Sequence, residues 1–159
     1  PANDLRFPLG VHEVQLVVQD GTNPALTLTA TVEVKDTTAP TLAPTASTTM
    51  LWPPNGSLRP VTICANTVDN GGGLITLTVD VQSNETETCC GRCDWCTLPD
   101  WYVDSIDNAT GMIQLRLRAE RSGRGEGRIY TITVTATDQG MNQSSAAVAV
   151  RVPHDRRKK

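Results

Sequence analysis

The chain has 159 residues, of which 38% are hydrophobic and 4% are aromatic, and its formal net charge at pH 7 is -3. A weakly acidic chain has no general attraction to nucleic acids or anionic membranes, and no apolar run approaches the ~20 residues that span a bilayer. We therefore expect no nucleic-acid partner and no membrane span. The length suits one domain of ordinary size and a shorter extension.

The start of the chain repeats its end. Residues 10–21 line up with residues 127–138, and a second alternating run follows each of them, at 27–36 and at 146–152. Both copies therefore have the pattern of strand, Asp-containing turn, strand. A full domain precedes the second copy, whereas only nine residues precede the first.

This mismatch predicts the domain organisation. Residues 1–39 are expected to form the C-terminal β-hairpin of an incomplete immunoglobulin-like repeat, which acts as an assembly or interdomain strand pair. Residues 40–153 are expected to form a complete domain with a cysteine-rich loop at 86–99, and residues 154–159 form a basic tail. Pro40 predicts that the joint between the two parts is short and stiff.

Alternating segments indicate the strands of the complete domain. Residues 41–50 are expected to give a first edge strand, and Trp-Pro-Pro-Asn-Gly at 52–56 gives a turn. Further strands are expected at 61–68, 74–83, 112–120, 128–137 and 145–153, with turns rich in Gly, Asp and Asn between them. The predicted fold is all-β: an immunoglobulin-like antiparallel β-sandwich preceded by a two-strand closing hairpin.

Several segments also carry a family resemblance. The chain resembles the end of a hyalin repeat at residues 7–14, 18–21 and 34–40. The hyalin repeat is an immunoglobulin-like module found in tandem in secreted and surface proteins. A version of this repeat in exported bacterial proteins is similar to residues 51–55, 117–123 and 152–155. The resemblance implies an immunoglobulin-like fold, an extracellular or cell-surface location, and a role as a spacer or adhesive stalk. Residues 86–99 depart from it, because cysteines replace the expected Gly/Asp-rich loop.

The cysteines allow three interpretations. Four of them, Cys89, Cys90, Cys93 and Cys96, lie in the loop, and Cys64 lies on a predicted strand. In an exported protein they would form disulfides, which leaves one of the five unpaired. Four thiolates would instead bind zinc. The spacing from Cys90 to Cys96 also suits three ligands of an iron–sulfur cluster, although the usual Cys-Pro is missing.

A set of acidic and amide side chains gathers at the predicted joint. In an immunoglobulin-like domain the incoming linker shares one end with the second-to-third and sixth-to-seventh strand loops, which here carry Asp36, Asp69 with Asn70, and Asp138 with Asn142. These oxygens suit calcium, which would neutralise acids that otherwise repel one another. The alternative is that Asp and Asn are simply common turn residues.

Other charged residues have simpler interpretations. The arginines at 116, 118, 121, 124 and 128 are expected on solvated strand edges, or else in a patch for an anionic polysaccharide. The acids Glu85, Asp100, Asp104 and Asp107 are expected to be turn residues, with a second cation site as the alternative.

Signals of catalysis are poor. His12 and His154 have no nearby nucleophile in the sequence, and no paired carboxylates lie in an apolar setting. Trp52, Trp95 and Trp101 are expected to fill the core or a loop, with a sugar-binding platform as the alternative. We therefore expect a protein that is not an enzyme.

The sequence favours a structural module: a subunit or repeat of a surface fibre, stalk or adhesin that assembles by β-strand addition. Its partner would be another copy in a head-to-tail polymer, or an adjacent repeat of the same chain. Two isolated strands are marginally stable, so the hairpin must add to a sheet elsewhere. Its assembly residues are expected to be Val14, Leu16, Val18, Leu28, Val32 and Val34. Alternatives are a metal-carrying or electron-transfer surface protein and a carbohydrate-binding module.

Overall fold

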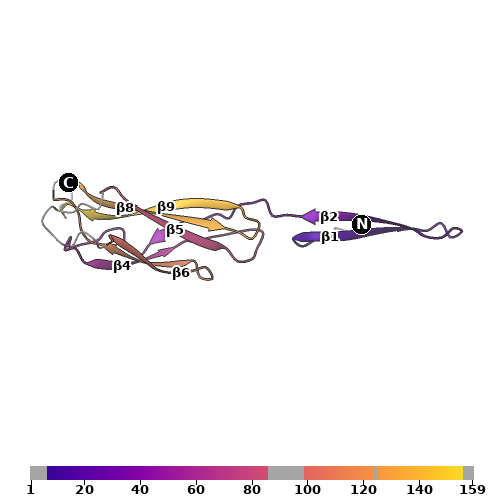
Figure 1. The fold of residues 1–159 in the computed structure, drawn as a ribbon, viewed down its shortest axis with the longest axis horizontal. Helices are drawn as coiled ribbons and strands as arrows, with labels where there is room; N and C mark the ends of the chain where they lie inside the picture. The colour runs from indigo at the N-terminus through magenta and orange to yellow at the C-terminus, as the bar shows by residue number, and fades with distance from the viewer. Residues whose placement is uncertain (1–6, 86–98, 124, 156–159) are drawn as a thin grey trace. The chain divides into compact units, whose positions relative to one another are not determined.

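The computed structural model describes residues 7–85, 99–123 and 125–155 and divides the chain into two compact units, Pro1–Thr37 and Thr38–Lys159 (Figure 1). The described residues form strands and turns without any helix, and so no helix there is long and apolar enough to cross a membrane. The all-β class that the sequence predicts is confirmed. The two units are described one at a time.

The first unit is a single antiparallel hairpin of β1 (Gly10–Val18) and β2 (Leu26–Val34). Its register runs from Gly10 opposite Val34 to Val18 opposite Leu26. Asp20 organises the turn, because its carboxylate accepts hydrogen bonds from the amides of Thr22 at 2.9 Å and Asn23 at 2.8 Å. These bonds, with that from the Asn23 side chain, lower the pKa of Asp20 to about 2.

The second unit is a sandwich of two antiparallel sheets, drawn as two layers in Figure 1. The four-stranded sheet has the order β3-β4-β7-β6, with β3 at Thr45–Ala46, β4 at Leu58–Cys64, β7 at Met112–Arg118 and β6 at Trp101–Asp107. The three-stranded sheet has the order β5-β8-β9, with β5 at Thr76–Ser83, β8 at Gly127–Thr137 and β9 at Gln143–Pro153.

Alternation of side chains builds the core between the sheets. In β8 every second residue from Tyr130 to Ala136 is fully buried, and β7 contributes Ile113, Leu115 and Leu117. The residues between them are polar or small and face outward, as in strands with one buried face. This period of two is the signal that made β5, β7, β8 and β9 predictable.

The edge strands differ from the expected pattern. The expected first strand at 41–50 reduces to β3 and two isolated bridges, Thr41 with Val68 and Met50 with Arg151, because Pro44 lacks an amide hydrogen to donate. Strand β4 ends at Cys64 rather than at residue 68. Strand β6 was not expected at all. It lies at the edge of its sheet with Val103 and Ile106 exposed and a bulge after Val103, so its sequence lacks a clear alternation.

The chain enters the sandwich beside two turns. Pro40 is fully buried, and its carbonyl accepts a hydrogen bond from the Ser144 hydroxyl at the start of β9. The amide of Thr41 donates to the carbonyl of Val68 at 2.8 Å. This end of the sandwich therefore joins three stretches: the entering chain, the segment after β4, and the turn between β8 and β9.

Candidate functional site

One face of the hairpin is apolar apart from His12, and most of its side chains are exposed. Directly opposed residues of an antiparallel pair point to the same side, so the register places one set together: Val14, Leu16, Val18, Leu26, Leu28, Ala30, Val32 and Val34. We call this set the apolar face. It includes every residue proposed for assembly from the sequence. Leu16 and Leu28, which face each other, are 58% and 54% exposed. Exposed patches of this kind mark interaction surfaces.

The hairpin has the same register as the closing hairpin of the sandwich. Gly10 opposite Val34 corresponds to Arg128 opposite Val152, and Val18 opposite Leu26 corresponds to Ala136 opposite Ser144. Both pairs are related by a shift of 118 residues, which also carries Asp20 onto Asp138. The sequence alignment, which set Gly10 against Gly127, is therefore out of phase by one residue. The shift of 118 preserves the pairing and carries the apolar face onto the inward face of β8–β9, whereas a shift of 117 would carry it onto the outward face.

The two hairpins differ in what covers them. In the sandwich, β5 pairs with the edge of β8 that faces away from β9, and the four-stranded sheet covers the inner face of β8 and β9. Ile132 and Val134 therefore have no exposed surface. Their counterparts in β1 are Val14 and Leu16. Within the described part of the first unit, β1 pairs with β2 alone. Hence β1–β2 shares the register of β8–β9, but no third strand and no second sheet of the first unit covers it within the described residues.

A second feature is a pair of buried carboxylates where the chain enters the sandwich. Asp69 follows Val68, and Asp138 follows the end of β8. One oxygen of each lies within 4.8 Å of the other. Asp138 is 6% exposed, and its carboxylate accepts hydrogen bonds from the Asn142 amide at 2.8 Å and from the Asn142 side chain at 2.9 Å.

Asp69 has no such support. Both of its carboxylate oxygens are buried and lack a hydrogen-bond partner within the described residues, and neither Asp69 nor Asp138 forms an ion pair there. Two negative charges within 4.8 Å repel each other by at least about 3 kcal/mol at an effective dielectric constant of about 20. The pair therefore lacks a positive charge to compensate it.

The roles of the remaining predicted calcium ligands stay predictions. Asn142 lies beside Asp138 and donates two hydrogen bonds to its carboxylate, and Asn70 is exposed. Asp36 is half-buried and precedes the second unit by two residues, so its part in the site stays a prediction.

A third feature, missed in the sequence, is a buried ionic network at the opposite end of the sandwich. Arg128, 5% exposed, lies 2.5 Å from a carboxylate oxygen of Asp100 and 3.5 Å from one of Glu85. Arg118 lies 3.5 Å from the other oxygen of Asp100 and also donates to the carbonyls of Gly56 and Pro99. Charges buried to this degree are retained only when they are paired.

Tyr130 completes the network. It accepts a hydrogen bond from Arg128 at 3.1 Å and donates one to the carbonyl of Arg118 at 2.9 Å, and its ring packs edge-on against Trp101. Burial raises the pKa of the Tyr130 phenol, and the positive charge of Arg128 opposes this effect in part.

This network corrects two expectations. Arg128 is not a solvated edge residue, because it alternates in phase with the inward-facing Tyr130; that phase was the available signal. The four acids do not form a second cation site. Glu85 and Asp100 pair with the buried arginines, Asp104 pairs with Arg116 on the surface, and Asp107 accepts bonds from the turn residues Ala109 and Thr110.

The cysteine loop lies outside the described residues. Cys89, Cys90, Cys93 and Cys96 fall in the stretch 86–98, so the disulfide, zinc and iron–sulfur interpretations stay predictions. Cys64 is described: it is a half-buried free thiol at the end of β4, opposite Met112 and next to the buried Ile63. Glu85 and Asp100, which flank the undescribed stretch, lie in the network at the Arg118 end. Cys64 is therefore at the other end of the sheet.

The described histidines and tryptophans have structural contacts. His12 bonds to the carbonyl of Pro8 and His154 to that of Gly123, and Trp101 packs against the core. Trp52 is half-buried in the Pro-rich turn, while Trp95 lies outside the described residues.

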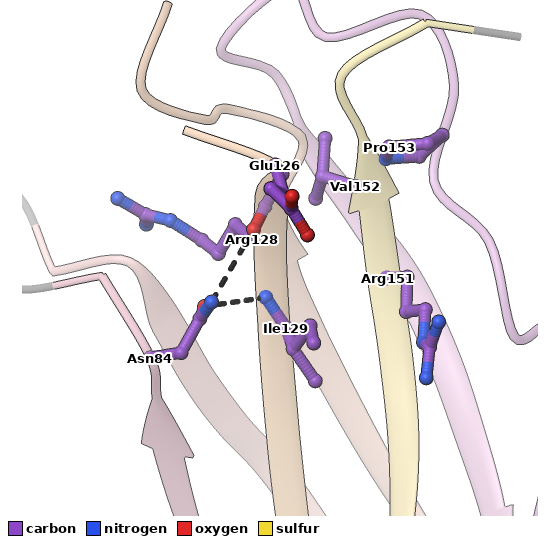
Figure 2. Close-up of a pocket in the computed structure, with 8 residues that line it drawn as sticks. Asn84, Glu126, Arg128, Ile129, Arg151, Val152 and Pro153 are labelled. Carbon is purple, nitrogen blue, oxygen red and sulfur yellow. Dashed lines mark hydrogen bonds between the residues drawn. The ribbon is translucent and has the colours of Figure 1, made fainter. Parts of the chain in front are cut away.

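A small pocket lies between Asn84, just after β5, and the ends of β8 and β9 near Gly127 and Pro153 (Figure 2). Asn84 crosses it, accepting from the Ile129 amide at 2.7 Å and donating to the Gly127 carbonyl at 3.3 Å (Figure 2). At about 240 Å³ it falls below the usual size of ligand sites, roughly 300–1,000 Å³. Asn84 therefore links the end of β5 to the start of β8 through these two hydrogen bonds.

Neither the models of known protein families nor the curated proteins contain a match to this chain.

Proposed function

We propose that this protein is a non-catalytic structural module of a surface fibre, stalk or adhesin, and that its hairpin closes a neighbouring immunoglobulin-like domain. The observation that supports this proposal is the apolar face, which has the register of β8–β9 but lacks the covering sheet. Burial of each Val or Leu of this face would contribute roughly 1.5–3 kcal/mol.

The partner of the hairpin is a set of strands equivalent to β3 to β7, without a closing hairpin of its own. A strand like β5 would pair with the free edge of β1, and a sheet like β3-β4-β7-β6 would cover the apolar face. Every copy of this chain already has its own sandwich closed by β8–β9. An adjacent repeat of the same chain therefore suits the hairpin better than an intact second copy in a head-to-tail polymer.

The hairpin also limits the chemistry of that partner. Gly10 and His12 occupy the places that Arg128 and Tyr130 have in the sandwich. A partner with a buried acid pair like Glu85 and Asp100 would then lack the arginine that lies against both acids in the sandwich. The neighbouring domain is expected to have apolar or neutral residues at these two positions.

Sedimentation velocity of the full chain, compared with a variant that lacks residues 1–37, tests this proposal. We expect no growing polymer in either protein, rapid proteolysis within the hairpin of the full chain, and the same melting temperature for the two sandwiches. Filaments that form from the full chain and disappear with the deletion would contradict the adjacent-repeat arrangement and indicate a polymer of identical subunits. A hairpin that resists protease in the monomer would contradict the need for a partner.

A further inference from the structure

The carboxylate pair of Asp69 and Asp138 lies where three stretches of the sandwich meet. Thr41 bridges to Val68 immediately before Asp69, and Ser144 anchors Pro40 just after the turn that Asp138 begins. Backbone contacts thus hold Val68, the residue before Asp69, and the amide of Asp138 donates to the carbonyl of Asn142 at 3.1 Å.

Acidic turn residues alone would not indicate a ligand. Here the carboxylate of Asp69 has both oxygens buried without any hydrogen-bond donor among the described residues, and it faces the carboxylate of Asp138, which is also buried. An aspartate that only stabilised a turn would accept amide bonds, as Asp107 does from Ala109 and Thr110. Asp69 therefore has ligand atoms without a partner.

We propose that Asp69 and Asp138 bind a calcium ion. Calcium binds oxygen ligands at about 2.3–2.6 Å, so a single ion can contact two oxygens that are 4.8 Å apart or closer. The two oxygens of Asp69 allow bidentate binding, and Asn142 holds the Asp138 carboxylate in place with two bonds. The ion replaces the repulsion of two buried charges with attraction to both, and so it stabilises the end of the sandwich through which the chain enters.

This inference concerns the sandwich alone and does not depend on how the hairpin assembles. The test uses the full chain, freed of metal by chelator, and compares thermal unfolding and calorimetric titration with calcium chloride. The variant is Asp69→Asn. The matched control is Asp107→Asn, because Asp107 is also a turn aspartate but has all its bonds within its own turn.

We expect calcium to raise the melting temperature of the wild-type protein and of Asp107→Asn. Asp69→Asn should lose this response, with at least a roughly tenfold weaker affinity. In chelator, Asp69→Asn should melt at the same temperature as the wild type or above it, because one of two repelling charges is gone; a merely structural aspartate would give a lower melting temperature. A wild-type protein unaffected by calcium, or an Asp69→Asn variant with the full response, would overturn the proposal. An equal response to magnesium would overturn the assignment to calcium.

Discussion

Arg128 shows how a single residue can be misjudged from the sequence. It belongs to a group of arginines that suggested a solvated edge, yet it is 5% exposed and pairs with two carboxylates. The alternation of β8 was visible in the sequence and places Arg128 on the inward side with Tyr130. What the sequence could not show is that Glu85 and Asp100, 15 positions apart in the chain, would both reach it.

The first prediction concerns Asp100. Asp100→Asn leaves Arg128 buried with one fewer negative charge, and it should lower the free energy of unfolding by about 3–5 kcal/mol. Urea unfolding of the purified variant measures this change. The matched control is Asp104→Asn, since Asp104 pairs with Arg116 in an exposed ion pair that should contribute little. An equal decrease in the free energy of unfolding of the two variants would contradict the expectation that the buried ion pair of Asp100 contributes more than the exposed ion pair of Asp104.

The second prediction concerns pH. Because burial raises the pKa of Tyr130, the folded protein keeps the phenol protonated at a pH where the unfolded chain ionises it. The contribution of Tyr130 should therefore be constant below about pH 10 and decrease as pH rises from there toward the folded-state pKa, by at most about 1.4 kcal/mol per pH unit. Urea unfolding at several alkaline pH values, with Tyr130→Phe for comparison, measures this component. The same slope in both proteins would contradict it.

At the scale of elements, the sequence predicted strands with two-residue alternation and failed at the edges. Strands β8 and β9 were predictable because their inward residues are apolar from Tyr130 to Ala136 and from Ala146 to Val152, whereas β6 has Asp104 and Asp107 in positions that suggest turns. The repeat between the two hairpins was also visible, but its phase was not. The backbone pairings of the two hairpins were needed to show that Val14 corresponds to Ile132. The sequence alone favoured an alignment of Gly10 with Gly127, which is wrong by one residue.

The third prediction concerns Cys64, which is a free thiol at the Met112 end of β4, whereas Glu85 and Asp100 lie in the ionic network at the Arg118 end. Seven strand residues separate the two ends, about 20 Å at the usual rise per residue. Cys64 should therefore remain a free thiol. Iodoacetamide labelling without reductant should give one fewer labelled cysteine in Cys64→Ser than in the wild type. An unchanged count would show that Cys64 is oxidised in the native protein.

At the scale of the whole molecule, the acidic set at the joint was only partly predictable. The loop order of an immunoglobulin-like fold placed Asp69 and Asp138 at one end, and the structure brings these two together. The sequence could not show that Asn142 would support Asp138 or that Asn70 would be exposed, because side-chain direction within a turn depends on its backbone dihedral angles. Function was less accessible still, since a fold of this kind does not determine a function.

The central claim is that the hairpin closes a sandwich in the register of β8–β9, and a tandem chimera tests it directly. Residues 38–130 are joined to residues 13–159, so that Glu13 follows Tyr130 with the shift of 118 that the pairings define. This chimera supplies the missing strands and retains Arg128 and Tyr130. The control joins residues 38–130 to residues 14–159, which moves the apolar face by one residue to the outside of the sheet.

The measurement is hydrogen exchange of the backbone amides at residues 14–18. The account predicts strong protection in the chimera, compared with rapid exchange in the natural chain and in the control with the shifted register. Exchange that is equally fast in both chimeras would contradict the claim that β1–β2 is a closing hairpin.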